Sequence, residues 1–435
     1  MESIDYQQLI FYLIPVFVIL LFALRRRLRQ HKHQKIQRES FEVGLTEPAS
    51  LHPVTDPGKC IGCGACVTAC PEGEVLGLIK GKAQLINPTK CIGHGACKAA
   101  CPFDAISLVF GTEKRGVDIP NVKENFETNV PGLFIAGELG GMGLIRNAVE
   151  QGRQAMDSIR KLSGMGKGKD LDVVIVGAGP AGLSATLGAQ QHKLRSVTIE
   201  QDSLGGTVYN FPRGKIVMTA PVIMPMVGKI KIRETTKEKL LALWQKIEKE
   251  KGLRINYREK LEDIKKDGDM FTVTTSKGTY RSRAVLLCIG RRGTPRKLGV
   301  PGEELPKVVY HLIDPEQYKG QHVLVVGGGD SALEAATSIA EQPGTTVTIS
   351  YRSDSFSRAK QKNRDKVTQA EAARKMQVVL SSNVKQFTAD KVTIDHNGKL
   401  MEIPNDATIV CAGGILPTPF LKQVGIEVET KHGTA

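Results

Sequence analysis

Two glycine-rich turns constrain the fold of this chain more than any other feature of its 435 residues. The first lies in residues 172–202, DVVIVGAGPAGLSATLGAQQHKLRSVTIEQD, which read as an apolar strand, a turn, a helix and a second strand. Gly177, Gly179 and Gly182 stand in the turn. Glu200 closes the second strand. Such glycines let a pyrophosphate approach the helix N-terminus, and an acid about 20 residues on can bind a ribose hydroxyl. The segment therefore predicts a dinucleotide-binding unit.

The same pattern returns in residues 322–360, HVLVVGGGDSALEAATSIAEQPGTTVTISYRSDSFSRAK, with Gly327 and Gly329 in the turn. Here no acid ends the second strand. Arg352 and Arg358 follow it instead, and a guanidinium at this place can pair with the 2′-phosphate that distinguishes NADP from NAD. The pattern predicts a second dinucleotide site that favours NADPH over NADH, with NADH as the alternative if these arginines belong only to a solvated loop.

Seven of the nine cysteines are clustered in two copies of one phrase. CIGCGACVTACP at 60–71 has the C-x2-C-x2-C-x3-C-P spacing, which brings three thiolates of a tight loop to one iron-sulfur cluster and directs the fourth to a second cluster. CIGHGACKAACP at 91–102 repeats the phrase, with His94 in place of the second cysteine. Zinc is less expected, because zinc sites take paired cysteines from two separate knuckles. Cys288 and Cys411 stand alone, which argues against a disulfide framework and for a reducing compartment.

Residues 52–110 resemble the bacterial two-cluster ferredoxins, which duplicate this motif and exchange the fourth ligand between the halves. The resemblance assigns two ligand sets: Cys60, Cys63, Cys66 and Cys101 for one 4Fe-4S cluster, and Cys70, Cys91 and Cys97 for the other. The second site is one thiolate short. Either His94 supplies the missing ligand, which would raise the reduction potential of that cluster, or the site holds a 3Fe-4S cluster or an open iron position beside an uninvolved histidine.

The N-terminal segment predicts a membrane anchor. Residues 9–24, LIFYLIPVFVILLFAL, carry no charge, whereas residues 25–38, RRRLRQHKHQKIQR, hold seven Lys and Arg and no acid. The apolar run is slightly short of the roughly 20 residues that span a bilayer, and the basic flank favours the cytoplasmic side. We expect a single-pass protein of the inner (cytoplasmic) membrane with its domains facing the cytoplasm; a signal peptide or a buried helix is the alternative. The net charge of +15 then reflects this flank rather than a nucleic-acid surface.

Together, the two dinucleotide units resemble the thioredoxin-reductase-like pyridine-nucleotide flavoproteins. Residues 310–336, YHLIDPEQYKGQHVLVVGGGDSALEAA, are most similar to the ferredoxin-NADP reductases of that group. The resemblance implies FAD on the first unit and NADP (or NAD) on the second. Disulfide reductases of the group carry a redox-active cysteine pair, but neither EQDSLGGTVYN at 200–210 nor VVYHLIDPEQYKG at 308–320 contains a cysteine. Thiol-disulfide exchange is therefore not expected.

The flavin domain is predicted to be circularly permuted. In this family a PGLF-type strand and a helix end the chain, whereas here TNVPGLFIAGELGGMGLIRNAVEQGRQAMDSIRKL stands at 128–162, before the first glycine turn. Domains tolerate such a cut when the old termini lie close together. A coincidental strand is the alternative. By the resemblance, further residues of the two nucleotide sites are Gly137, Glu138, Arg146, Asn147, Ala148, Gly206, Thr207 and Asn210 for FAD, and Ser331 for NADP.

The expected fold class is α/β, with two Rossmann-like dinucleotide-binding domains, an α+β ferredoxin-like domain and one N-terminal transmembrane helix. The expected segments are an anchor with its basic flank (1–30), a linker (31–51), the ferredoxin domain (52–110), the permuted part of the FAD domain (111–165), the main FAD domain (166–303), the NAD(P) domain (304–408) and the return segment of the FAD domain (409–435).

The expected function is that of a membrane-anchored flavo-iron-sulfur oxidoreductase. It would transfer electrons between NAD(P)H, FAD and two iron-sulfur clusters, to or from a ferredoxin, a quinone or another redox partner at the membrane. No acid-base residue is assigned, because the chemistry belongs to the cofactors. The alternatives are a reductase of an external low-molecular-weight disulfide and a redox sensor without turnover. No nucleic-acid partner is expected, and both a monomer and a homodimer remain open.

Overall fold

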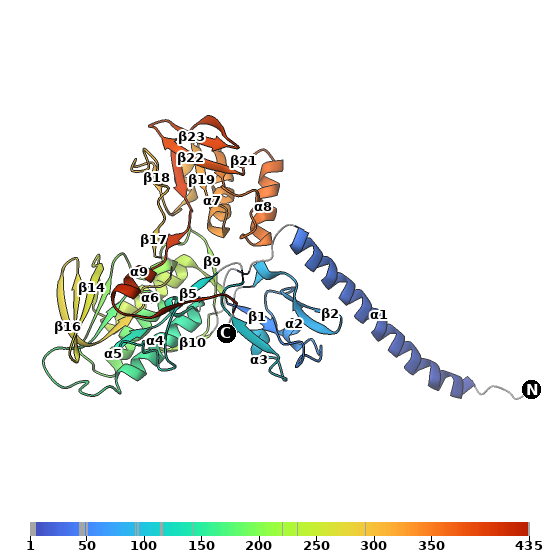
Figure 1. Cartoon of the computed structure of the whole chain (residues 1–435), viewed down its shortest axis with the longest axis horizontal. Coiled ribbons are helices and arrows are strands. Elements are labelled where there is room, and N and C mark those ends of the chain that lie inside the picture. Colours follow the sequence, from blue (N-terminus) through green and yellow to red (C-terminus); the bar gives the residue numbers. More distant parts are fainter. Residues whose placement is uncertain are drawn as a thin grey trace, which may run out of the picture. The chain divides into compact units, whose positions relative to one another are not determined.

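The computed structural model in Figure 1 describes most of the chain. The described residues are 6–42, 48, 51–91, 93, 95–113, 116–141, 143–219, 221–232, 234–291 and 293–433. The chain divides into two compact units. Residues 1–115 and 432–435 form the N-terminal unit, and residues 116–431 form the C-terminal unit.

The N-terminal unit contains one long helix and a small α+β domain with two antiparallel strand pairs, β1 with β4 and β2 with β3. Its elements are α1 (Tyr6–Glu42), β1 (His52–Thr55), α2 (Ala65–Ala69), β2 (Leu76–Ile79), β3 (Lys82–Leu85), η1 (Pro88–Lys90), α3 (Ala96–Ala99) and β4 (Ile106–Val109). Buried Leu76 and Ile106, one from each strand pair, share a core with Cys60, Cys66 and Cys97. The cysteines are thus part of the core that holds the two pairs together.

The helix α1 is the largest departure from the expected segments. It continues to Glu42, through the first part of the segment 31–51 that the sequence assigns to a linker. In the part of the chain that the structure describes, no helix has an apolar stretch long enough to cross a bilayer. The structure therefore does not support the transmembrane helix predicted in residues 1–30. The physical reason is the length of the run, because four arginines follow Leu24 within five residues.

The first half of the C-terminal unit is built on a seven-stranded sheet in the order β13-β8-β7-β16-β15-β14, with β6 also paired with β16. Its strands are β6 (Leu133–Ile135), β7 (Leu171–Val176), β8 (Ser196–Glu200), β13 (Ile255–Tyr257), β14 (Leu261–Asp267), β15 (Met270–Thr275) and β16 (Gly278–Leu287). Strand β7 pairs in parallel with β16, and the side chains of residues 172–176 in β7 and 284–287 in β16 are buried on both faces of the sheet. The helices α4 (Ile145–Ile159) and α5 (Pro180–Gln191) belong to this half.

The second half is built on a five-stranded parallel sheet in the order β18-β25-β19-β20-β21. Its strands are β18 (Val308–Val309), β19 (His322–Val326), β20 (Thr346–Ser350), β21 (Met376–Val379) and β25 (Ala407–Val410). The helices α7 (Asp330–Ala340) and α8 (Gln361–Ala372) pack on it, and β22 (Ser382–Phe387), β23 (Lys391–His396) and β24 (Lys399–Pro404) form a separate three-stranded sheet. Both halves have the predicted βαβ turns.

Residues 116–165 fold into the first half of the C-terminal unit. The strand β6 lies parallel to β16 in the register Val285 to Leu133. The helix α4 packs directly on α5, because a Cβ added to Gly152 would lie 2.1 Å from the carbonyl oxygen of Ala181. Ala148, Val149, Gly152, Ala155, Met156 and Ile159 are buried on one face of α4. A segment that precedes the first glycine turn in the chain therefore contributes a strand and a helix to the same domain.

The two ends of the C-terminal unit also lie side by side. The strand β27 (Val428–Lys431) pairs antiparallel with β5 (Val117–Pro120), and Lys431 stands opposite Val117. Inside this unit, no turn connects the two strands, because the chain enters it at residue 116 and leaves it at residue 431. The two strands are therefore neighbours in space although they stand at opposite ends of this unit's sequence.

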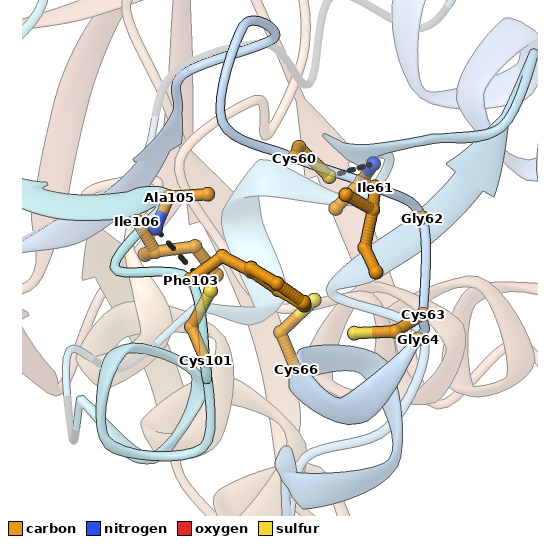
Figure 2. A pocket seen from close by; sticks show the side chains of 11 residues that line it. Cys60, Ile61, Gly62, Cys63, Gly64, Cys66, Cys101, Phe103, Ala105 and Ile106 are labelled. Carbon is orange, nitrogen blue, oxygen red and sulfur yellow. Dashed lines mark hydrogen bonds between the residues drawn. The ribbon is translucent and has the colours of Figure 1, made fainter.

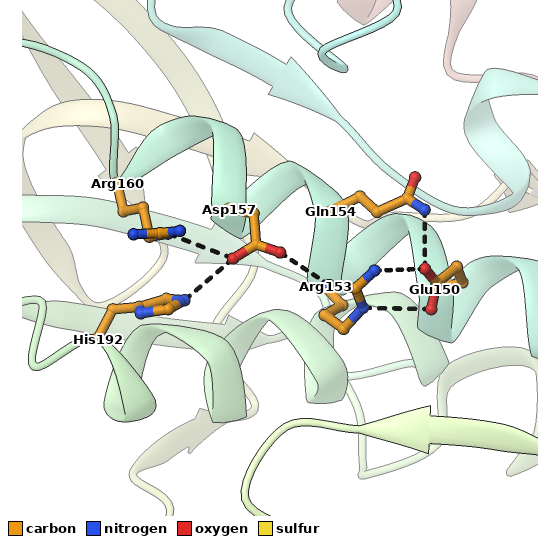
Figure 3. Close-up of polar contacts among 6 residues, drawn as sticks. All are labelled: Glu150, Arg153, Gln154, Asp157, Arg160 and His192. Carbon is orange, nitrogen blue, oxygen red and sulfur yellow. Dashed lines mark hydrogen bonds and ion pairs between the residues drawn. The ribbon is translucent and has the colours of Figure 1, made fainter. Parts of the chain in front are cut away.

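A network of charged side chains covers the exposed face of α4 (Figure 3). Arg153 contacts Glu150 (2.5 Å) and Asp157 (2.8 Å) along the helix. Asp157 also lies 3.1 Å from Nε2 of His192, the residue that follows α5. Because all these groups are about one-third exposed, each contact contributes only about 0.5 kcal/mol. The network links the C-terminal end of α5 to α4, but its contribution is too small to determine how the two helices pack.

Asp172 anchors the loop between α4 and β7. Its carboxylate is fully buried and accepts hydrogen bonds from the backbone N–H groups of Gly166 and Arg195, both at 2.8 Å, and from the Arg195 guanidinium at 3.2 Å. Burial alone would raise the pKa of Asp172, but the Arg195 guanidinium and these N–H groups hold it below its ordinary value. The loop is therefore tied to β7 by a buried carboxylate.

We expect Asp172→Ala to lower the free energy of unfolding by about 3 kcal/mol, because buried donors and a guanidinium lose their partner. Chemical denaturation at pH 7 measures this difference. Because the pKa is lowered in the folded protein, the contribution is present above the ordinary carboxyl pKa and is lost as the pH falls through the lower folded value. Asp157→Ala, in the exposed network, is the control and should cost less than about 1 kcal/mol. Equal losses for the two variants would contradict the assignment.

Candidate cluster and nucleotide sites

Four cysteines of the N-terminal unit surround one pocket (Figure 2). Cys60, Cys63 and Cys66 come from the loop before α2 and its first turn, and Cys101 comes from the loop after α3. Phe103, Ala105 and Ile106 complete the lining on the side of Cys101. The structure thus brings together the four thiols that the ferredoxin resemblance assigns to one cluster, although Cys101 is 35 residues from Cys66.

Glycines allow the cysteine loop to take this shape. Gly62 and Gly64 have φ values of +74° and +83°, which L side chains rarely adopt. A Cβ at Gly62 would lie 2.0 Å from the carbonyl oxygen of Gly81, in the turn of the β2–β3 hairpin, so the hairpin contacts the loop directly. Ala83 N–H donates to Cys60 Sγ at 3.4 Å, and Ala105 N–H donates to Cys101 Sγ at 3.3 Å. Such donors stabilise negative charge on a cluster's sulfur ligands.

Four thiols around one pocket match the number of ligands that a 4Fe-4S cluster requires. In the described residues, no group of three or more His, Cys, Asp and Glu side chains is arranged to hold a single metal ion. Burial, with a smaller contribution from Cys60, raises the pKa of Cys66 to about 11. A metal must therefore displace protons from these thiols when it binds.

The second ligand set is brought together in part. Burial, with smaller contributions from the nearby Cys97 and Cys70, raises the pKa of Cys91 to about 11, and burial also raises the pKa of Cys97. The three thiols therefore lie within electrostatic range of one another. His94 lies outside the described residues, so its ligation stays a prediction.

The first glycine turn has the shape that a pyrophosphate requires. Gly177 has a φ of +102°, and a Cβ there would lie 2.5 Å from the Cys288 carbonyl oxygen. A Cβ at Gly182 would lie 1.7 Å from the Gly177 carbonyl oxygen. At Gly179, the residue that caps α5, no atom would lie within 4 Å of an added Cβ. Two glycines therefore provide close packing, while the third leaves open space at the helix N-terminus.

Glu200 has a role that the sequence does not predict. It is buried, and its carboxylate accepts hydrogen bonds from Ala178 N–H at 2.7 Å and Asp202 N–H at 2.9 Å. Burial raises the pKa of Glu200 although both N–H groups oppose the shift. The Glu200 side chain thus stabilises the glycine turn through these hydrogen bonds. Its contact with a ribose hydroxyl stays a prediction.

Residues from two distant segments meet the first turn. A Cβ at Gly206 would lie 3.3 Å from the Gly179 Cα, and Thr207 follows it in η3 (Gly206–Val208). Gly137 lies against α5 from the other side, where an added Cβ would be 3.0 Å from the Ala181 Cβ. Gln151 Oε1 accepts from Gly137 N–H at 2.8 Å, a contact across 14 residues that no local pattern signals.

The remaining predicted FAD residues stand near these positions with different exposures. Ala148 is buried on α4, where its Cβ is 3.8 Å from the Cβ position of Gly137. Arg146 and Asn147 occupy the first turn of α4, exposed and partly exposed respectively, and Glu138 opens η2 (Glu138–Gly140). Asn210 lines the nucleotide cavity described next. The cofactor contacts of these five residues stay predictions.

The second glycine turn opens on a cavity of about 660 Å³ in the C-terminal unit. Five predicted residues line it: Gly327, Gly329, Ser331, Arg352 and Arg358. As in the first turn, an added Cβ would clash at the first glycine, 2.5 Å from the Cys411 carbonyl oxygen, and would meet no atom within 4 Å at Gly329. Among the described residues, neither Arg352 nor Arg358 has an ion-pair partner for its exposed guanidinium. The two are therefore free to bind an anion.

The cavity has further polar residues that the sequence does not identify. Lys215 and Glu334 form an ion pair of 2.5 Å on its wall. The ring of Tyr351 stacks on Phe356 at 5.7 Å between centroids, and its edge would lie 2.3 Å from a Cβ at Gly328. Within the described lining, Cys411 is the one cysteine. Cys288 does not line this cavity, and burial raises the pKa of its thiol. The described lining therefore contains one cysteine and no cysteine pair.

Fold and sites together define a two-nucleotide redox enzyme that carries a ferredoxin-like unit. Residues 174–434 match the pyridine nucleotide-disulphide oxidoreductase family, and residues 52–102 match the 4Fe-4S dicluster domain. The chain belongs to the pyridine nucleotide-disulphide oxidoreductase family and is an enzyme. The predicted oxidoreductase class, with FAD, a pyridine nucleotide and iron-sulfur as its cofactors, is thereby supported.

Individual relatives show two kinds of named activity. Ferredoxin–NADP reductase of Ignicoccus hospitalis is 31% identical over 270 residues, which cover 60% of this chain and 83% of the relative. The enzyme of the same name from Picrophilus torridus is 33% identical, with 60% and 78% covered. A solved structure of the bacillithiol disulfide reductase Bdr (YpdA) from Staphylococcus aureus is 27% identical, has a TM-score of 0.53 and covers 60% of this chain and 82% of its own.

Proposed function

We propose that this enzyme transfers electrons between NADPH and a one-electron redox partner through its iron-sulfur unit. One observation carries the proposal: a single chain combines a nucleotide cavity with two unpaired guanidinium groups and a pocket surrounded by four thiols. When bound, FAD supplies the exchange between the two electrons of a nicotinamide and the single electrons of a cluster. Similarity to enzymes named ferredoxin–NADP reductase supports the same reading.

The residues of this chain bind and orient the groups that react. Gly179 leaves room for a pyrophosphate at the N-terminus of α5, and Glu200 supports that turn. Arg352 and Arg358 supply positive charge for a 2′-phosphate. The cysteine thiols hold the cluster. We propose two clusters, the second completed by His94 and therefore of higher potential, with a ferredoxin or a quinone as the partner.

We also propose that the flavin domain is circularly permuted. Three contacts support this interpretation: β6 beside β16, α4 on α5, and the antiparallel pair of β5 and β27. Joining Lys431 to Val117 by a short turn would restore the family's order, in which the PGLF strand and its helix come last. The ferredoxin-like domain then occupies the place of that turn, joined to β5.

Location at the inner membrane stays a prediction. It is supported by the apolar residues of α1 between Val16 and Leu24, whose large side chains are 38–67% exposed, and by the arginines that follow them. Flotation of the full chain with anionic vesicles tests it, and a chain that stays at the bottom of the gradient would contradict it. Whether the protein is a monomer or a homodimer also stays open.

Replacement of Cys101 by Ser tests the electron path. We expect NADPH to reduce the flavin of this variant at an unchanged rate, while reduction of an added ferredoxin falls at least 100-fold, because the first ligand set is broken. Stopped-flow absorbance and EPR spectra of anaerobic samples follow the two steps. Cys288→Ala, a buried cysteine outside both ligand sets, is the control. Ferredoxin reduction by Cys101→Ser at the wild-type rate would contradict the proposed path.

A second candidate function is reduction of an external low-molecular-weight disulfide. Likeness to bacilliredoxin reductase of Bacillus subtilis (26% identical) and to the bacillithiol disulfide reductase structure supports it. Cys411 in the nucleotide cavity would be the thiol closest to such chemistry. NADPH oxidation that depends on added bacillithiol disulfide and disappears in Cys411→Ala would favour this function. Family membership as an enzyme argues against the redox sensor without turnover.

A further inference from the structure

The basic half of α1 packs against the small domain of its own unit. Lys32 Nζ lies 2.6 Å from Glu74 Oε1, and Gln37 Nε2 donates to Gln84 Oε1 at 3.2 Å. Between them His33 is only 6% exposed. Since Glu74 precedes β2 and Gln84 lies in β3, these three residues hold the helix along the β2–β3 hairpin.

His33 completes the edge of that hairpin. The sheet has two strands, so β2 has a neighbouring strand on one side only. On the other side, Leu78 N–H donates to His33 Nδ1 at 2.9 Å. The Leu78 carbonyl oxygen lies 3.3 Å from the same nitrogen, but an N–H group can only donate, so Nδ1 is an acceptor and the neutral ring carries its proton on Nε2. Gly77 makes room for the ring, because a Cβ there would lie 2.8 Å from His33 Cγ.

The opposite face of the hairpin contacts the loop of the first ligand set at three points. Leu78 Cδ1 lies 3.3 Å from the Cβ position of Gly64, between Cys63 and Cys66. The Gly81 carbonyl oxygen packs against Gly62, and Lys82 Nζ donates to the Cys60 carbonyl oxygen at 2.5 Å. Leu78 therefore bonds to α1 through its backbone and packs on the cysteine loop through its side chain.

The hairpin also supplies the Ala83 N–H that donates to Cys60 Sγ. Reduction adds negative charge to a cluster and its sulfur ligands, so an N–H donor stabilises the reduced form and raises the potential. The strength of this bond depends on where the hairpin lies. A residue that fixes the hairpin can therefore change the cluster without touching it.

We propose that His33 is a positioning residue of the first cluster, acting through Leu78 and the β2–β3 hairpin. The inference rests on the proposed function, in which Cys60, Cys63, Cys66 and Cys101 hold a cluster. It gives the segment that reads as a basic membrane flank a second role inside the iron-sulfur unit. Leu78 contacts the loop of the first ligand set directly at Gly64, whereas it shares only the common core with Cys97 of the second set. We therefore expect the first cluster to respond and the second not.

His33→Leu in the full-length holoenzyme tests the proposal, because leucine cannot accept the Leu78 hydrogen bond. Hydrogen exchange of the segment 76–79, measured by mass spectrometry, should accelerate roughly 5-fold, as expected for a lost bond of about 1 kcal/mol. EPR-monitored redox titration should show a lower midpoint potential for one cluster and no change for the other. His31→Leu, an exposed histidine on the same helix, is the matched control and should change neither measurement.

His33→Asn is the second variant, because its side-chain oxygen can take the place of Nδ1 as an acceptor. It should restore both slow exchange and the potential, which loss of packing alone would not do. Faster exchange in His33→Leu with unchanged potentials of both clusters would overturn the inference and leave the proposed function intact. Wild-type protein purified without oxygen that contains no iron would overturn the proposed function and this inference with it.

Discussion

A chain that lacks residues 116–163 should bind no FAD. This deletion removes β6 from the sheet beside β16 and uncovers the face of α5 that packs on α4. Buried Leu133, Phe134, Ile135, Met156 and Ile159 leave the core with it. Burial of one such side chain contributes about 2 kcal/mol, so their joint loss of about 10 kcal/mol is comparable with the whole stability of an ordinary domain. Flavin absorbance after purification, with the bound FAD counted per chain, measures the result.

A reordered chain is the control for this deletion. Residues 170–431 would be followed by a short glycine-containing turn and then by 117–163, with residues 1–113 placed first. If the hairpin of β5 and β27 is a cut connection, this chain should bind FAD one to one, as the natural order does. Tight FAD binding by the deletion variant would defeat the permutation proposal, and so would a reordered chain that cannot fold.

Simultaneous replacement of Arg352 and Arg358 by Leu should convert a preference for NADPH into near indifference. Each guanidinium contributes a charge-assisted contact worth about 1.5 kcal/mol to a 2′-phosphate, so KM for NADPH should rise roughly 100-fold. NADH has no 2′-phosphate, and its KM should change less than about threefold. Steady-state rates with an artificial acceptor give both values.

Arg374→Leu is the matched control for the arginine pair. Arg374 is an exposed arginine between α8 and β21, and it does not line the nucleotide cavity. Its loss should leave both KM values unchanged. An equal rise of KM for NADPH and NADH in the double variant would show that Arg352 and Arg358 bind a part of the nucleotide that the two coenzymes share, and would remove the argument for NADPH.

The glycine turns and the first cysteine loop could be predicted from the sequence, because the residues that form each of them are close together in the chain. A glycine turn between a strand and a helix is specified within about ten residues, because φ and close packing are local properties. The turns at Gly177 and Gly327 could therefore be read directly. The same holds for Cys60, Cys63 and Cys66, whose spacing alone places three thiols in one loop.

Contacts between distant segments could be reached only by resemblance or by the structure itself. Cys101 joins the first cysteine loop, and β6 joins β16 across 150 residues, because of strand order and not because of any local signal. The sequence predicts Glu200 as a ribose ligand. Its hydrogen bond from Ala178 N–H is seen only in the structure, because it depends on the position of the buried carboxylate next to the glycine turn. Arg352 and Arg358 could be named from the sequence, whereas their freedom from ion pairs could not.

The helix α1 shows most clearly the difference between what the local sequence determines and what tertiary contacts decide. The sequence by itself determines that residues 9–24 are apolar and residues 25–38 are basic. That both belong to one helix, which continues to Glu42, is seen only in the structure. What the charged half does is decided by tertiary structure, since the partner of His33 is a backbone N–H 45 residues away on the free edge of β2. Hydropathy describes how favourably a segment leaves water. It does not describe the hydrogen bond between Leu78 N–H and His33, because that donor is in place only after the β2–β3 hairpin has folded.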